Sequence, residues 1–249
     1  MTDDGRLTTS FFSSNPPLVF AHRGGAALAP ENTVAAFDNG IALGVDGIEL
    51  DVRLSLDGEV VVHHDDTLER TTQLTGPVAA RRADELERAG VPALADVLAR
   101  YPGTKVIVEM KLDTAEFAAA VVRAVRAAGA VSRVCLGSFG LRALRTARAL
   151  EPAIATSAAR IEVQWALYRS WCRVPASRVP YGGYQVPEWA GRTRVVSRRF
   201  VADAHRAGLG VQVWTVDAAE DARRLLALGV DGLITDRPDI IVPICQSLR

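Results

Sequence analysis

The chain has 249 residues, of which 49% are hydrophobic and 23% charged, and its 29 basic and 29 acidic residues leave no net charge. This length fits one large α/β barrel or two smaller domains, and the apolar content is enough for a substantial core. The lack of net charge argues against a nucleic-acid partner, because proteins that bind duplexes usually carry a clear basic excess.

The N-terminal segment carries acidic residues where a signal peptide would be positively charged, and no apolar segment follows it. No run reaches the roughly 18 apolar residues that a membrane span needs. Three scattered cysteines, Cys135, Cys172 and Cys245, do not form a disulfide framework. We therefore expect a cytoplasmic protein without stable membrane association, with a flexible leader over 1–16 and one folded domain over 17–249. The oligomeric state is left open.

Short apolar segments alternate with amphipathic ones along the chain. The expected strands are 18–22, 46–51, 105–110, 133–138, 153–157, 179–185, 210–216 and 231–235. The expected helices are 32–43, 92–100, 115–128, 139–149, 160–171, 198–207 and 218–228. Continuous apolar strands separated by helices are typical of a parallel sheet covered on both faces. About eight such units without a linker favour an α/β fold of one closed (β/α)₈ TIM barrel over a doubly wound sheet.

The regular alternation is interrupted after the second expected strand. Residues 52–63 alternate in polarity around Asp57-Gly58, which predicts a β-hairpin. The polar segment 65–90 continues this excursion before the next helix. We therefore expect a small insertion at about 52–90.

Polar side chains gather where the expected strands end. They are His22, Arg23, Glu49, Asp51, Glu109, Lys111, Ser138, Trp214, Thr215, Thr235 and Asp236. In (β/α)₈ enzymes the active site lies at the carboxyl ends of the strands. The pattern therefore predicts an active site at this end of the barrel.

Three of these residues are carboxylates. Glu49 and Asp51 are two positions apart on a strand, so their side chains point to the same face. Such carboxylates repel each other unless a cation lies between them or one is protonated. With Glu109 they offer three oxygen ligands, which suit one divalent cation, Mg²⁺ or Ca²⁺, better than zinc. The alternative is that they only form ion pairs with neighbouring basic residues.

The segment from His22 to Gly25 is suited to an anion. Its glycines let backbone N–H groups approach closely, and the Arg23 guanidinium can hold phosphate in a bidentate fork. Lys111 alternates with Glu109 and so lies on the same face, where it can stabilise a phosphate oxygen or the developing transition state. Glu31, at the start of a helix, either caps that helix or helps to order His22, Arg23 or the metal.

A second imidazole comes from the pair His63–His64. Adjacent strand residues point to opposite faces, so at most one of the two is expected to reach the site, and periodicity does not say which. Two imidazoles on either side of a phosphorus atom could deprotonate a nucleophile and protonate a leaving oxygen.

Taken together, these motifs resemble the glycerophosphodiester phosphodiesterase family. The matching segments are AHRGG, PENTVAAF, LGVDGIELDV, DGEVVVHHDDTLERTT, VPALADVL, VIVEMK, LGSF, VQVWTVD and GVDGLITDRP. They occur in family order from 19 to 238, and their combination is specific although no single segment is.

The resemblance implies metal-dependent hydrolysis of glycerophosphodiesters, such as glycerophosphocholine or glycerophosphoethanolamine, to glycerol 3-phosphate and an alcohol. It implies Glu49, Asp51 and Glu109 as metal ligands, His22 and His64 as the acid/base pair, Arg23 and Lys111 as phosphate ligands, and Trp214 as a pocket wall. Attack on phosphorus by the glycerol 2-hydroxyl, which forms a cyclic phosphate, and direct attack by water both remain open.

Segment 158–195 matches no family motif, so the choice of alcohol is expected to depend on it. The alternative function is a lysophospholipase D-like enzyme acting on lipid diesters, which would need an apolar groove or patch at the rim. Trp165, Leu167, Tyr168, Trp171 and Trp189 make that conceivable, although the helical spacing of the first four is more typical of core positions. A barrel that only binds phosphodiesters is disfavoured because every residue that the chemistry needs is present.

Overall fold

A computed structural model describes residues 11–12, 15–174 and 178–248. Its barrel strands are β1 (Leu18–Ala21), β2 (Gly47–Leu54), β4 (Lys105–Met110), β5 (Val134–Gly137), β6 (Ala155–Thr156), β7 (Gly183–Pro187), β10 (Gly210–Trp214) and β11 (Gly232–Thr235). They pair in parallel in the order β6-β5-β4-β2-β1-β11-β10-β7. A parallel bridge between Ser157 and Gly183 joins the two ends. The predicted (β/α)₈ barrel is confirmed.

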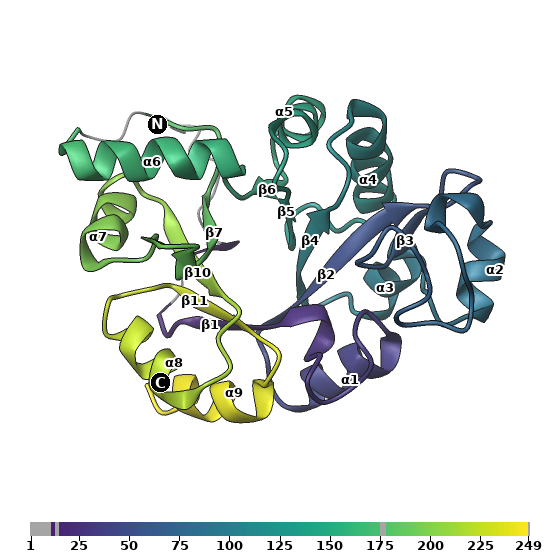
Figure 1. The fold of residues 1–249 in the computed structure, drawn as a ribbon, viewed down its shortest axis with the longest axis horizontal. Coiled ribbons are helices and arrows are strands. Elements are labelled where there is room, and N and C mark those ends of the chain that lie inside the picture. Colours follow the sequence, from purple (N-terminus) through teal and green to yellow (C-terminus); the bar gives the residue numbers. More distant parts are fainter. Residues whose placement is uncertain (1–10, 13–14, 175–177, 249) are drawn as a thin grey trace.

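The helices lie around the outside of the strands (Figure 1). They are α1 (Val34–Ala42), α2 (Ala83–Arg88), α3 (Leu94–Arg100), α4 (Ala115–Ala127), α5 (Leu141–Leu150), α6 (Arg160–Cys172), α7 (Arg198–Arg206), α8 (Ala219–Leu226) and α9 (Pro238–Gln246). Two were not expected, α2 within the insertion and α9 after the last strand. In the described part of the chain, no helix combines the length and apolar character that crossing a bilayer requires.

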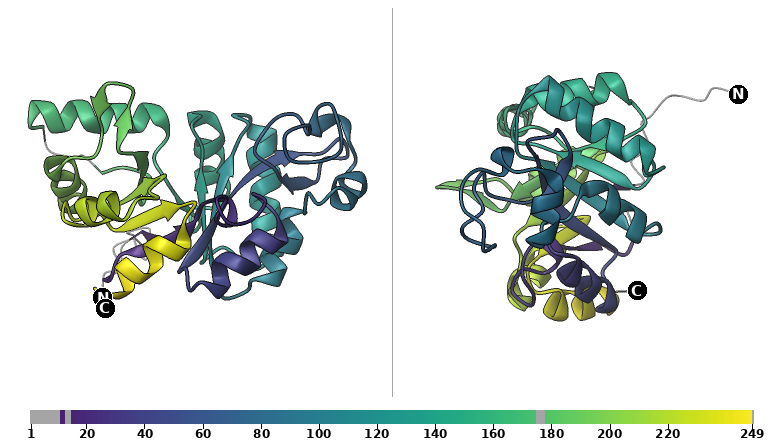
Figure 2. Two further views of the ribbon diagram at one scale, coloured as in Figure 1. Left: turned by 60° about the horizontal axis from the view of Figure 1, so that its bottom comes forward. Right: turned by 90° about the vertical axis from the view of Figure 1, so that its right-hand side faces the viewer.

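The predicted insertion follows β2. Strand β3 (Val60–Val62) pairs antiparallel with the end of β2, with Val52 opposite Val62. A short 3₁₀ helix (Val78–Ala80) and α2 continue the excursion. A second small hairpin, formed by β8 (Trp189–Ala190) and β9 (Thr193–Arg194), follows β7. Both excursions project from the same side of the barrel (Figure 2).

Side chains alternate along each strand between the barrel interior and the layer under the helices. On β4, Val106 and Val108 belong to the apolar layer that the helices cover. Ile107 belongs instead to a separate interior cluster with Phe20 and Ile234. The same alternation sends Glu109 into the interior, one layer closer to the carboxyl end. The barrel is therefore apolar at its amino end and polar at its mouth.

Part of the expected leader 1–16 belongs to this core. Phe11 and Phe12 are buried in the interior cluster, whereas residues 1–10 and 13–14 lie outside the described residues. Glycines leave room for the Phe12 ring, because a Cβ on Gly183 would lie 2.5 Å from it. The prediction of a flexible leader does not hold for these two residues, since the amino end of the barrel needs apolar side chains to fill it.

We predict that Phe12→Ala lowers the free energy of unfolding by roughly 3–5 kcal/mol, because it leaves a cavity at a fully buried position. Phe139→Ala is the matched control, since 57% of Phe139 is exposed, and its effect should stay below about 1 kcal/mol. Urea denaturation of both variants checks this. Equal destabilisation of the two would contradict the role of Phe12 in filling the barrel.

Candidate active site

A cavity of about 610 Å³ opens at the carboxyl ends of the strands. Almost all of the predicted site residues line it, namely His22, Arg23, Glu49, Asp51, His64, Glu109, Lys111 and Trp214. Glu31 does not line the cavity but forms an ion pair with Arg23, which does. Residues that are up to about 190 positions apart in the sequence thus meet in one cavity because successive strand ends are neighbours around the barrel.

The turn after β1 presents His22 and Arg23 to the cavity. Residues His22–Gly24 form a short 3₁₀ turn in which Arg23 and Gly24 have φ angles of 50° and 88°. A Cβ on Gly24 would lie 2.7 Å from the Cβ of Ala36, so only glycine fits there against α1. This close contact with α1 fixes the direction of the two functional side chains.

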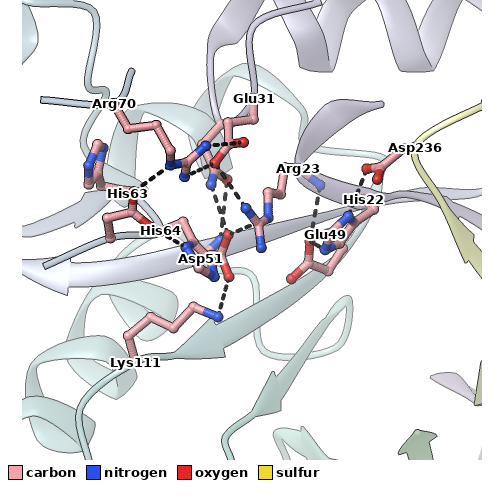
Figure 3. A network of polar contacts seen from close by, with 12 residues as sticks. His22, Arg23, Glu31, Glu49, Asp51, His63, His64, Arg70, Lys111 and Asp236 are labelled. Atoms are coloured by element: carbon pink, nitrogen blue, oxygen red, sulfur yellow. Dashed lines mark hydrogen bonds and ion pairs between the residues drawn. The ribbon is translucent and has the colours of Figure 1, made fainter. Parts of the chain in front are cut away.

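The imidazole of His22 lies between two carboxylates (Figure 3). Its Nδ1 is 2.7 Å from Asp236 Oδ1, and its Nε2 is 3.9 Å from Glu49 Oε2. Burial disfavours the imidazolium, but the charge of Glu49 and the hydrogen bond with Asp236 outweigh it, so the pKa of His22 is raised. The sequence placed Asp236 at the rim without giving it a role; its pairing with His22 depends on the closure of the barrel.

The three carboxylates share a largely buried environment. Burial raises the pKa of Glu49 to about 7, and the nearby charge of Asp51 adds to the increase. Burial also raises the pKa of Glu109 to about 8, although Lys111 opposes it. Asp51 differs because the charges of Lys111 and Arg23 outweigh its burial, and its pKa is lowered. Of the three carboxylates, Asp51 is therefore the one whose negative charge is best balanced by positive side chains of the protein.

Cationic groups and hydrogen-bond donors surround these carboxylates. The Lys111 Nζ is 2.7 Å from Asp51 Oδ1, and Arg23 Nε forms an ion pair with Asp51 Oδ2 at 3.1 Å without hydrogen-bond geometry. The Asn32 amide donates to Asp51 Oδ2 at 2.9 Å, a contact that the sequence did not suggest. The backbone N–H of Arg23 donates to Glu49 Oε2 at 3.0 Å. In contrast, Glu109 Oε1 is buried and has no hydrogen-bond partner among the described residues.

The structure separates the two adjacent histidines. His64 lines the cavity, and its Nδ1 is 2.6 Å from Asp65 Oδ1. His63 points to the other face, where it is buried with its Nε2 3.0 Å from the carbonyl oxygen of Thr67. The geometry therefore favours His64 as the second imidazole of the site.

A chain of ion pairs links the two sides of the site (Figure 3). Arg70 donates to Asp65 and also to both oxygens of Glu31, and Glu31 in turn accepts from Arg23 at 2.9 Å. The hydrogen bond from Arg70 is the main reason that the pKa of both Glu31 and Asp65 is lowered. Glu31 thus orders Arg23 and, through Arg70, the partner of His64. Arg70 was not expected at the site.

Gly137 is a further residue that the sequence did not single out. A Cβ at this position would lie only 2.4 Å from Glu109 Oε2, so the glycine makes room for the carboxylate.

Two aromatic side chains also line the cavity. Phe139 packs edge-on against Trp214 with ring centroids 6.1 Å apart. These two rings give the polar centre an apolar wall.

The expectation for the aromatic residues of α6 is only partly met. Leu167 is a core residue with 7% exposure, as expected. Trp165, Tyr168 and Trp171 were expected in the core, but their exposed fractions are 60%, 57% and 61%. The prediction was wrong because α6 is apolar on more than one side and only the side with Leu167 and Ser170 is covered.

The carboxylates of the cavity are suited to a divalent cation by their chemistry. Among the described residues, no three or more histidine, cysteine, aspartate or glutamate side chains are arranged so that they could hold a metal ion as they stand. The donor set is nevertheless suitable, since three carboxylates supply the hard oxygen ligands that Mg²⁺ and Ca²⁺ prefer. Two features indicate missing positive charge, namely the unpartnered Glu109 Oε1 and the raised pKa values of Glu49 and Glu109.

Comparison with known proteins agrees with this geometry. The model of the glycerophosphoryl diester phosphodiesterase family matches residues 22–240. A glycerophosphodiester phosphodiesterase of Caldanaerobacter subterraneus is 31% identical over 252 residues, which cover 92% of this chain and 98% of the relative.

Solved structures show the same fold. A phosphodiesterase of Oleispira antarctica, crystallised with the product sn-glycerol-3-phosphate, has 29% identity and a TM-score of 0.74 over 96% of this chain and 97% of its own. A glycerophosphodiester phosphodiesterase of Agrobacterium tumefaciens has 27% identity and a TM-score of 0.75 over 91% and 99%. With its fold, its cavity and these matches, the chain belongs to the glycerophosphoryl diester phosphodiesterase family of enzymes.

Proposed function

We propose that this enzyme hydrolyses glycerophosphodiesters, such as glycerophosphocholine or glycerophosphoethanolamine, to glycerol 3-phosphate and an alcohol with the help of one divalent cation. The observation that carries the proposal is that two imidazoles, three carboxylates and two cationic side chains share one cavity. The structural neighbour from Oleispira antarctica that holds sn-glycerol-3-phosphate supports the identity of the product.

Glu49, Asp51 and Glu109 would hold the cation, either Mg²⁺ or Ca²⁺. Bound there, the ion would withdraw charge from a phosphate oxygen and help an attacking hydroxyl to lose its proton. Its charge would also compensate the two carboxylates whose pKa values burial raises. Lys111 and Arg23, which both contact Asp51, would then be free to hold the remaining phosphate oxygens.

The two histidines supply proton transfer. Each has its Nδ1 against an aspartate, Asp236 for His22 and Asp65 for His64. With Nδ1 engaged in this way, the Nε2 of each ring is the atom available for exchange with the substrate. One ring would accept the proton of the attacking hydroxyl, from the glycerol 2-position or from water, and the other would protonate the leaving alcohol oxygen. In the route through the glycerol 2-hydroxyl, a water molecule would then hydrolyse the cyclic phosphate to glycerol 3-phosphate. Trp214 would form the wall against which the organic part of the diester packs.

The first prediction from the proposed function concerns the reaction itself. Purified enzyme should release glycerol 3-phosphate from glycerophosphocholine when Mg²⁺ or Ca²⁺ is present, and EDTA should abolish the release because the carboxylates then lack their cation. A coupled glycerol-3-phosphate assay measures the product. Undiminished release in EDTA would refute the metal requirement, and no release with either ion would refute the proposed substrate.

The second prediction separates the histidines. His22→Ala and His64→Ala should each lower kcat by about 100-fold or more, because each removes one proton-transfer group. His63→Ala is the matched control, since its ring lies outside the cavity, and it should keep a kcat close to that of the unaltered enzyme. The assignment fails if His63→Ala loses kcat while His64→Ala retains it.

The third prediction follows from the raised pKa values of Glu49 and Glu109. In the unfolded chain both groups ionise at ordinary pH values, whereas in the fold they keep their protons up to about pH 7 and 8. In EDTA, these groups should therefore lower the free energy of unfolding as the pH rises from their ordinary pKa of 4.5 to their raised pKa values of about 7 and 8. A divalent cation selects the ionised forms, so the increase in Tm that it produces should be larger at about pH 8 than at about pH 6.

Thermal unfolding with and without Mg²⁺ or Ca²⁺ at the two pH values checks this expectation. Glu109→Gln should lose most of the metal-induced increase in Tm and should gain stability in EDTA at the higher pH. Glu116→Gln is the control because Glu116 is an exposed carboxylate outside the cavity. A metal-induced increase that is the same at both pH values would contradict the prediction.

A further inference from the structure

The cavity extends well beyond the residues that perform the chemistry. Its continuation is an apolar groove between α6 and the β8–β9 hairpin, and it belongs to segment 158–195, which matched no family motif. The apolar residues that line this groove are Val163, Leu167, Trp171, Pro187, Ala190 and Val195. The groove is continuous with the reaction centre, because these residues and the catalytic carboxylates line the same cavity.

The groove runs along one face of α6. The helix residues that line it are Arg160, Val163, Gln164, Leu167 and Trp171, a spacing of three or four that keeps them on one side. Arg160 is next to the reaction centre, since its backbone N–H donates to the carbonyl oxygen of Phe139, which lines the same cavity. Trp171 is eleven residues further along, or roughly 16 Å at the rise of an α-helix. Figure 1 shows α6 beside α7 and β7, the elements that support it.

The charge in the groove argues against a cationic occupant. Within the described residues, the carboxylates that line the cavity are Glu49, Asp51 and Glu109, and all three belong to the reaction centre. The charged side chain on the groove side is that of Arg160. An ammonium group placed there would meet an arginine and would have no carboxylate to pair with. A neutral apolar group would bury its surface against Val163, Trp171 and Val195 at no such cost.

We infer that this groove binds an unbranched apolar chain on the alcohol side of the diester. The preferred substrates are then glycerophosphodiesters whose alcohol carries an alkyl chain, and small cationic alcohols such as choline are turned over less efficiently. This inference rests on the proposed function, because it assumes that the reaction centre cleaves glycerophosphodiesters. The length of the groove matches a chain of about ten to twelve carbons at roughly 1.3 Å per methylene along the 16 Å of α6.

A series of sn-glycero-3-phospho-n-alkanols from ethanol to dodecanol tests the inference, with glycerophosphocholine as the reference substrate. All of them release glycerol 3-phosphate, so one assay serves the series. Below the micellar concentration, kcat/KM should rise by roughly twofold or more per methylene over the first members, because each buries additional apolar surface. It should level off near dodecanol, where the groove ends.

Two tryptophans on the same helix provide a matched pair of variants. Trp171 lines the groove, whereas Trp165 does not, and they are 61% and 60% exposed, so neither substitution should impair folding. Trp171→Ala should lower kcat/KM for the dodecyl diester by about fivefold to tenfold, with less than a twofold change for the ethyl diester. Trp165→Ala should change neither value by more than about twofold. Ala190→Glu places a charge in the groove, so kcat/KM should rise less with alkyl-chain length in this variant, as in Trp171→Ala.

Each outcome supports or overturns the inference separately from the proposed function. If glycerophosphocholine is turned over but kcat/KM does not rise with longer alkyl chains, the inference is overturned and the proposed function stays intact. If kcat/KM rises only when the alkyl chain is attached to the glycerol, as in a lysophospholipid, the assignment of the groove to the alcohol is overturned. Equal losses in Trp165→Ala and Trp171→Ala would show a general surface effect and overturn it as well. Failure with every diester would overturn the proposed function.

Discussion

Three carboxylates buried at the mouth of the barrel impose the constraint on which the rest of the site depends. Burial disfavours the charged forms of Glu49 and Glu109 and raises their pKa values to about 7 and 8. Lys111 and Arg23 compensate Asp51, and one oxygen of Glu109 has no hydrogen-bond partner in the described residues. Such an arrangement is costly for folding and is typical of functional sites, where pKa values are often shifted.

The barrel tolerates this polar mouth because its amino end is filled with apolar side chains. Phe12 and Phe20 lie in the interior cluster with Ile107, and Glu109 follows Ile107 on the inward face of the same strand. Glycines supply the space on both levels, Gly183 for the ring of Phe12 and Gly137 for the carboxylate of Glu109. Stability and catalysis are thus divided along the barrel axis, as is usual for this fold.

Helix α6 serves two surfaces at once. Leu167 and Ser170 are buried, and Leu167 also lines the groove together with Val163 and Trp171. This double use explains why the apolar pattern of the helix is too broad for a simple amphipathic helix.

The order of the strands, their parallel packing and the polar residues at their ends follow from the sequence, because hydrophobic periodicity and residue type are local properties. These local properties are enough to place His22, Glu49, Asp51, Glu109 and Lys111 at one end of a barrel. Periodicity left the choice between His63 and His64 open; the family motif pointed to His64, and the tertiary structure places that residue in the cavity. Only the tertiary structure decided that Asp236 pairs with His22 across 214 residues and that Phe12 fills the barrel. Periodicity tells which side chains share a face, but which face meets which partner is fixed only when distant segments close into one barrel.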